Sequence, residues 1–298
     1  MLVGLSALAI GTRAGGKSGD SADARTARSA LADRAEANRL KGALMPLLQY
    51  VREGQPRDAL KVLSGGSGSA VGPAVMRSIH DGATSALTNL DQLDETAVRS
   101  GPSLRLIKAA TSLYAEAAGL AADASDGAPA TSRVALATMG DRLLRFADAL
   151  FDQARRLGKD DLIPASAVRL DPPEAVPDIG PPVGVEGQSP PALLKSRRSA
   201  VSVGVRCLRQ PTAGTASGGR EGTCPEGPGL AMAAAGALHD EGDRSEQAIG
   251  REIAFRVWAE AEQLAVTLAK PDSARGDLDR PQRLRALART ILQVDGSR

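Results

Sequence analysis

The scarcity of aromatic side chains is the feature that most constrains how this chain can fold. Only 2% of its 298 residues are aromatic: one Trp, two Tyr and three Phe. The core must therefore be built from Leu, Val, Ile and Ala, a set that favours closely packed helices over sheets. The composition predicts an all-α fold, and the length allows one large or two ordinary domains.

Helical periodicity is the second clear pattern. Leu and Ala recur at every third or fourth position in segments separated by Gly and Pro, which predicts amphipathic helices. One such stripe consists of Leu106, Ala110, Leu113, Ala117 and Leu120. Side chains that alternate in size let helices interdigitate, and connections of about eight residues or fewer favour antiparallel neighbours. We therefore expect an antiparallel helical bundle.

The first helix is expected over residues 23–51. Its apolar face contains Ala27, Leu31, Ala35 and Asn38, and we expect Leu44, Leu47, Leu48 and Val51 to extend that face. Pro46 lies inside this segment. Because proline lacks an N–H and its ring clashes with the preceding turn, we expect it to kink or restart the helix.

A change of amino-acid composition divides the chain. Residues 164–230 are rich in Pro and Gly, which excludes regular helix and predicts a linker or a largely disordered insert with one lone strand over residues 200–208. The expected organisation is a flexible or apolar N-terminal segment (1–22), a helical bundle (23–163), the insert (164–230) and a C-terminal helical segment (231–298).

Two helix starts carry capping residues in the sequence. Thr131 or Ser132 can cap a helix that continues to Leu157. Asp243 can cap the helix over 243–270, with Glu246 three residues later as in a capping box. A last helix is expected from Pro281 onward.

Residues 11–18, with the sequence GTRAGGKS, match the phosphate-binding loop of P-loop NTPases. In that interpretation Gly11 and Gly16 let backbone N–H groups surround the phosphates, Lys17 neutralises their charge and Ser18 holds Mg²⁺. The cofactor would be ATP or GTP with Mg. Residues 19–21 delay the expected helix, and we find no set of strands for the parallel sheet that such proteins need. A flexible linker is the competing interpretation.

Only two histidines are present, and each precedes an aspartate. A helical chain with His80 and the pair His239–Asp240 resembles the HD family of metal-dependent phosphohydrolases, in which imidazole and carboxylate ligands hold an ion that activates water. The two histidines here lie on opposite sides of the Pro-rich insert, which departs from that family's spacing. We therefore expect no metal site, with His80 at the edge of a helix and His239 in a loop.

Cys207 and Cys224 are the only cysteines. They flank a stretch rich in Gly, Thr and Ser, so in an exported protein they could close a loop. The alternative is two unrelated thiols, since two cysteines in a long chain do not make a disulfide framework.

The N-terminal residues 2–10 form a short apolar run that allows a signal sequence, a truncated membrane anchor, a buried strand or a frayed terminus. No run reaches the roughly 20 apolar residues that span a bilayer. We expect a cytoplasmic protein, or an exported or anchored one if the N-terminus is truncated.

Charge and motifs together favour a binding role. A formal net charge of +2 gives no specific sign of a nucleic-acid partner. Membrane contact is conceivable through the N-terminal segment or the Arg-rich last helix. Because few residues are arranged for chemistry, we expect a helical scaffold or protein-interaction module with a protein partner or self-association. The alternative is a P-loop nucleotide-binding enzyme, an NTPase or a kinase.

Overall fold

A computed structural model describes residues 18–51, 55–63, 71–93, 101–125, 129–158, 197–210, 228–241, 245–269 and 277–294. Within these ranges the regular elements are all α-helices, which confirms the all-α fold class. The helices are α1 (Ser18–Val51), α2 (Gln55–Leu63), α3 (Val71–Asp91), α4 (Gly101–Ser125), α5 (Ala130–Gly158), α6 (Arg197–Arg209), α7 (Pro228–Glu241), α8 (Glu246–Leu268) and α9 (Arg280–Val294).

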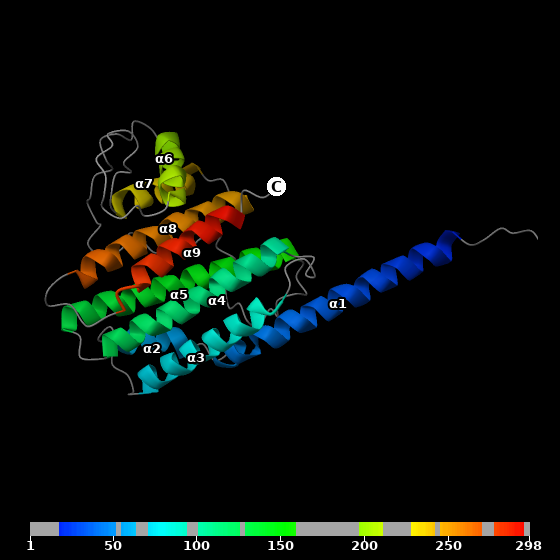
Figure 1. Ribbon diagram of the computed structural model, residues 1–298, viewed down its shortest axis with the longest axis horizontal. Coiled ribbons are helices and arrows are strands. Elements are labelled where there is room, and N and C mark those ends of the chain that lie inside the picture. Colours follow the sequence, from blue (N-terminus) through cyan, green and yellow to red (C-terminus); the bar gives the residue numbers. More distant parts are fainter. Residues whose placement is uncertain are drawn as a thin grey trace, which may run out of the picture.

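The helices stack in layers around the long pair α4 and α5 (Figure 1). On one side of this pair lie α2, α3 and the C-terminal half of α1, and on the other lie α8 and α9. The short helices α6 and α7 cover the outer face of the α8 and α9 layer. One hydrophobic core runs through all of these layers.

The predicted stripes form this core. Every member of the stripe Leu106, Ala110, Leu113, Ala117 and Leu120 on α4 is buried. Small residues let the helix axes come close: a Cβ atom added to Gly82 on α3 would lie 2.5 Å from the carbonyl oxygen of Pro46 on α1. This close approach accompanies a core whose largest fully buried side chains are nevertheless aromatic: Trp258, Phe146, Phe151 and Phe255.

The lone strand expected over residues 200–208 is wrong, because this segment forms α6. The alternation of Val201, Val203 and Val205 resembles the two-residue period of a strand. The fully buried residues are instead Ala200, Gly204, Cys207 and Leu208, which follow the helical period. Burial against α7 and α9 overrides the β-propensity of the valines.

The proposed insert, residues 164–230, contains α6, and α7 begins near its end at Pro228. Residues 159–196 and 211–227 lie outside the described residues. Helical structure is also present before Asp243, because α7 precedes α8.

The expectation for α1 needs two corrections. The helix begins at Ser18, ahead of residue 23. It also continues through Pro46, so of the expected kink or restart the restart does not occur. The apolar face is also not continuous. Leu31 is 68% exposed whereas Leu44 is fully buried. At about 100° per residue these two side chains point about 140° apart around the helix.

The capping predictions were also wrong in detail. The N-cap of α8 is Ser245, whose side chain accepts a hydrogen bond from the Ala248 backbone N–H at 3.3 Å. Thr131 and Ser132 lie inside α5, which begins at Ala130. The boundaries of α5 and α8 moved by a few residues, while these two helices themselves were predicted correctly.

Candidate functional site

Polar side chains buried between helices form three clusters. In the first, the hydroxyl of Tyr114 on α4 donates a hydrogen bond to Asp148 on α5, and Arg57 on α2 donates to the same carboxylate at 2.5 Å. Burial raises the pKa of Asp148, although both hydrogen bonds act in the opposite direction. Burial and the neighbouring Asp148 also raise the pKa of Tyr114. The cluster ties three helices together.

This cluster was not expected from the sequence, although the sequence contains a signal for it. Asp148 lies on one helical line with Leu144 and Phe151, both of which are buried. A carboxylate on an apolar line needs a buried partner, because an unpaired charge is costly there. Nothing in the sequence pattern shows that the partners come from α2 and α4.

The second cluster joins α5 to α8. Nε of Arg142 lies 2.5 Å from Oε1 of Glu260, and both side chains are almost completely buried. Burial raises the pKa of Glu260, and Arg142 and then Arg256 lower it. On α8, Glu252 accepts hydrogen bonds from Arg256 at 2.8 Å and 3.0 Å. Nδ1 of His239 on α7 lies 3.2 Å from Oε1 of the same Glu252.

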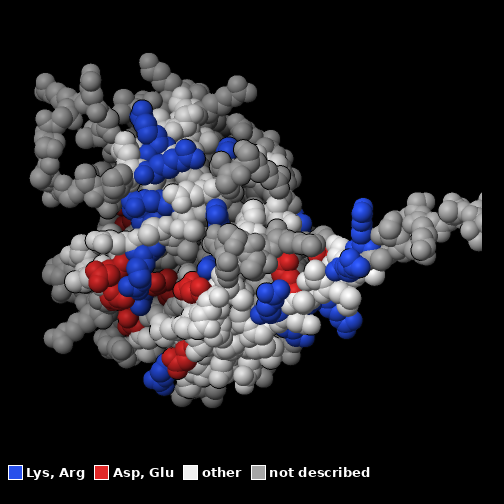
Figure 2. Space-filling model, turned by 45° about the vertical axis from the view of Figure 1, so that its right-hand side comes forward, with Lys and Arg blue, Asp and Glu red and all other residues white. Residues whose placement is uncertain are grey.

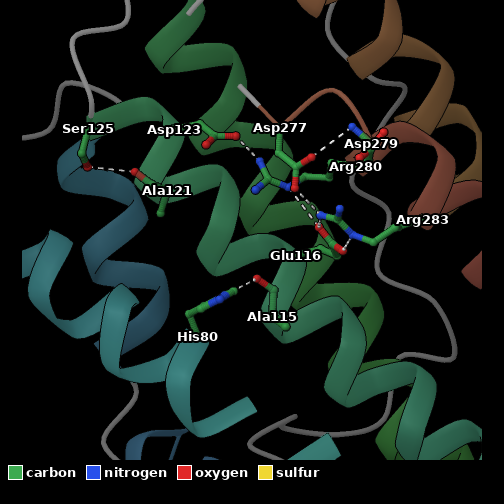
Figure 3. Close-up of polar contacts among 10 residues, drawn as sticks. All are labelled: His80, Ala115, Glu116, Ala121, Asp123, Ser125, Asp277, Asp279, Arg280 and Arg283. Atoms are coloured by element: carbon green, nitrogen blue, oxygen red, sulfur yellow. Dashed lines mark hydrogen bonds and ion pairs between the residues drawn. The ribbon is translucent and has the colours of Figure 1, made fainter. Parts of the chain in front are cut away.

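The third cluster joins α4 to the start of α9 (Figure 3). Glu116 accepts hydrogen bonds from Nε of Arg280 at 3.0 Å and from Nε of Arg283 at 2.6 Å. Arg280 also pairs with Asp123, and Arg283 pairs with Asp277 at 2.7 Å. Burial raises the pKa of Asp123, whereas the hydrogen bond from Arg283 lowers that of Asp277.

These ion pairs neutralise much of the positive charge of the last helix, α9. Arg280 and Arg283 are matched by carboxylates of the third cluster. Arg285 pairs with Glu262 at 2.9 Å and its guanidinium lies 5.6 Å from the ring centroid of Trp258. Most of the positive charge of this Arg-rich helix is thus neutralised within the protein. Arg289 differs from the other three, because Nε of its guanidinium donates a hydrogen bond to the Leu208 carbonyl oxygen.

Ser18 is the one residue of the phosphate-binding motif that the structure describes, and it is the first residue of α1. Gly11, Gly16 and Lys17 lie outside the described residues. The expected delay between the motif and the helix is wrong, since α1 begins directly after Lys17. No strand occurs among the described residues that could form the sheet of a P-loop protein.

The two histidines contact different helices. Nδ1 of His80 on α3 lies 3.3 Å from the Ala115 carbonyl oxygen, whereas His239 contacts Glu252. His239 lies in the last turn of α7, which corrects the expected loop position. In the described part of the chain, no three His, Cys, Asp or Glu side chains gather as metal ligands would.

Cys207 is fully buried on α6 and is disulfide-bonded. The sequence contains one other cysteine, Cys224, which lies outside the described residues. Of the two alternatives that the sequence left open, the bonded form is the one in which the structure has Cys207.

The N-terminal half of α1 is the candidate functional site. Residues 18–35, called the stalk below, extend away from the bundle (Figure 1). The buried residues of α1 begin at Glu36, and the described side chains before it are exposed or half-buried. The stalk presents Ala27, Leu31 and Ala35 on one side, within about 80° of each other.

Comparison with protein-family models, with curated proteins and with solved structures gives no match for this chain. Over the residues that the structure covers, none of the helices combines the length and the apolarity that crossing a membrane requires. The function must accordingly be argued from the residues themselves.

Proposed function

We propose that this protein is a helical scaffold or protein-interaction module, and that the stalk is the element it offers to a protein partner. The observation that carries the proposal is the 68% exposure of Leu31 on a helical segment that leaves the body of the protein. A single exposed leucine is common on protein surfaces. Its position on a projecting helix, between Ala27 and Ala35, is what supports a contact role.

Helix energetics support the same conclusion. Isolated helices shorter than about 12–15 residues are marginal in water, and the stalk, residues 18–35, is longer than this and continuous with the packed half of α1. The stalk is rich in Ala and Arg, which have high helix propensity, and this keeps it helical without a partner. A helix that is prepared in this way binds at a lower entropic cost than a disordered segment would.

A site-specific crosslinking experiment tests this proposal. A photoreactive amino acid at Ala35 on the stalk is compared with one at Val266, which is 51% exposed on the body of the protein. We expect an adduct of defined mass from position 35 that position 266 does not give. An adduct with twice the mass of the chain would identify self-association, and an adduct of any other mass would identify a second protein.

The substitution Leu31→Glu supplies the matched control. It should abolish the adduct formed at position 35, because a charge replaces the apolar contact, and it should leave the helical circular dichroism unchanged. Val266→Glu makes the same change on the body and should leave the adduct intact. Equal yields from positions 35 and 266, or an adduct that persists in Leu31→Glu, would contradict the proposal.

One observation favours the alternative, a nucleotide-binding enzyme. In a phosphate-binding loop the motif opens directly into a helix, and α1 does begin at Ser18. A nucleotide at about 100 times its Kd would stabilise the protein by about 2.7 kcal/mol. We therefore expect this alternative to show a melting shift with Mg·ATP or Mg·GTP that is lost in Lys17→Ala. The absence of a shift with either nucleotide would dismiss it.

A further inference from the structure

Where α6 meets α9, three arginines have no carboxylate partner within the part of the chain that the structure describes. The sequences of these two helices contain eight arginines and no aspartate or glutamate. Arg280, Arg283 and Arg285 are matched by carboxylates of other helices. Among the described residues, Arg206, Arg209 and Arg289 have no such ion pair, and we call these three the arginine patch.

The geometry places these guanidiniums at one end of α6. Nε of Arg289 donates a hydrogen bond to the Leu208 carbonyl oxygen at 2.8 Å, which brings α9 to the last turn of α6. Arg206 and Arg209 are both exposed, and their spacing of three residues puts them on one side of that turn. Figure 2 shows blue side chains with hardly any red ones on the upper part of this face, over α6.

The patch carries more charge than the protein neutralises nearby. The end of a helix has a partial negative charge of about half an elementary charge, which favours cations there. Three guanidiniums exceed that charge several times. Partial burial, and then repulsion from Arg285 on the same helix, lowers the pKa of Arg289.

We propose that the arginine patch binds an acidic segment of a protein partner. Guanidinium groups match carboxylates in geometry and form paired, charge-assisted hydrogen bonds. Arg206 and Arg209 lie within one turn of α6, about 5 Å apart along the helix axis, which corresponds to about two residues of extended chain. The surface therefore fits a short linear segment with several Asp or Glu side chains.

The composition of the surface selects this partner over two others. The large apolar side chains that are exposed among the described residues are Leu31, Met45, Val134, Val266 and Leu278, and none of them lies on α6 or α9. The patch thus lacks the apolar side chains with which a helix enters a bilayer. Neither helix contains an aromatic residue, so bases of single-stranded nucleic acid would have no ring on which to stack.

The test is a binding titration on the full chain with a fluorescent oligoglutamate peptide, followed by anisotropy. The double substitution Arg206→Glu with Arg209→Glu should weaken binding by about tenfold or more, since two attractive charges become repulsive. The matched control is Arg25→Glu with Arg28→Glu on the stalk. That pair has the same spacing, exposure and charge change, and it should alter the affinity by less than about twofold.

Further measurements distinguish between classes of partner and detect variants that have lost their fold. Arg206→Gln with Arg209→Gln removes the charges without reversing them and should give a smaller loss, while circular dichroism verifies the fold of each variant. Phosphatidylcholine vesicles with and without phosphatidylserine form the membrane arm, and single-stranded oligonucleotides form the nucleic-acid arm. Leu31→Glu should leave peptide binding unchanged, so failure of the stalk proposal and failure of this one are distinguishable.

Several outcomes would overturn the inference. Equal weakening by the patch pair and the stalk pair would show that only overall charge matters. Binding to phosphatidylserine vesicles or to oligonucleotides without binding to the peptide would assign the patch to another class of partner. A wild-type chain that does not bind the peptide at low salt, where screening is weakest, would also refute it.

Discussion

The hydroxyl of Tyr114 donates a hydrogen bond to Oδ1 of Asp148, while Arg57 approaches the other oxygen of the same carboxylate at 2.5 Å. Tyr114 is 3% exposed and Asp148 is 8% exposed, so this contact lies inside the bundle. Its three residues belong to α4, α5 and α2. The contact therefore fixes the relative positions of helices that the apolar stripes alone would allow to slide.

The substitution Tyr114→Phe should lower the free energy of unfolding by about 1–3 kcal/mol, because it leaves a buried carboxylate oxygen without its donor. Urea unfolding followed by circular dichroism measures the change. Tyr50→Phe is the matched control, since Tyr50 is half-buried and no hydrogen bond of its hydroxyl occurs among the described residues. It should cost less than about 0.5 kcal/mol. Similar losses in both variants would contradict the role given to Asp148.

The buried carboxylate Glu260 should make stability depend on pH. Burial raises its pKa above that of the unfolded chain, so between the two pKa values the folded protein binds more protons than the unfolded one. The contribution is present below the unfolded pKa and is lost as pH rises through the folded pKa. In Glu260→Gln the decrease of unfolding free energy with rising pH should be smaller than in wild type. Urea unfolding at a series of pH values measures both slopes, and identical slopes would argue against this shift.

Two glycines of the α1 and α3 region should respond to alanine with opposite signs. A Cβ at Gly82 would lie 2.5 Å from the Pro46 carbonyl oxygen and 3.0 Å from Cδ2 of Tyr50, so Gly82→Ala forces α1 away from α3. We expect a loss of about 1–3 kcal/mol. A Cβ at Gly42 meets nothing within 4 Å, and Gly42→Ala should raise helix stability by about 0.5–1 kcal/mol. Thermal unfolding compares the two, and a shift of the same sign in both would contradict the close approach.

Reduction of the disulfide should destabilise the protein. In the chain-entropy account, a crosslink that closes a loop of about 15 residues contributes about 3 kcal/mol. Dithiothreitol should accordingly lower the melting temperature of the wild type, and it should have no such effect on Cys224→Ser. Thiol titration of the denatured, unreduced wild type should find no free thiol. A reactive thiol in that experiment would show that Cys207 is not bonded in solution.

Much of the fold could be predicted from the sequence because helix formation depends on local spacing. The stripe of α4, from Leu106 to Leu120, identifies its buried face without knowledge of any partner. The same logic failed for α6, where Val201, Val203 and Val205 imitate a strand over a stretch too short for the period to be distinguished. It also failed for α1, where two apolar faces follow each other at different angles and look continuous in the sequence.

The candidate sites were less predictable, for a physical reason. Whether Leu31 lies in the core or on a projecting helix depends on where the bundle ends, and neighbouring residues do not encode that. The charge of the last helix is a similar case. Arg280, Arg283 and Arg285 look equivalent to Arg289 in the sequence, but carboxylates from α4 and α8 and the loop before α9 neutralise the first three.

The sequence by itself determined that this chain is helical and that Leu and Ala would face inward. These properties follow from spacing along the chain, which acts over one or two helical turns. Only the tertiary structure decided that the first half of α1 leaves the bundle and that Asp148 meets Tyr114. It alone also decided which arginines of α9 meet a carboxylate among the described residues. Each of these depends on contacts between residues far apart in the chain. The periodicity of a single helix does not determine which other helices pack against it.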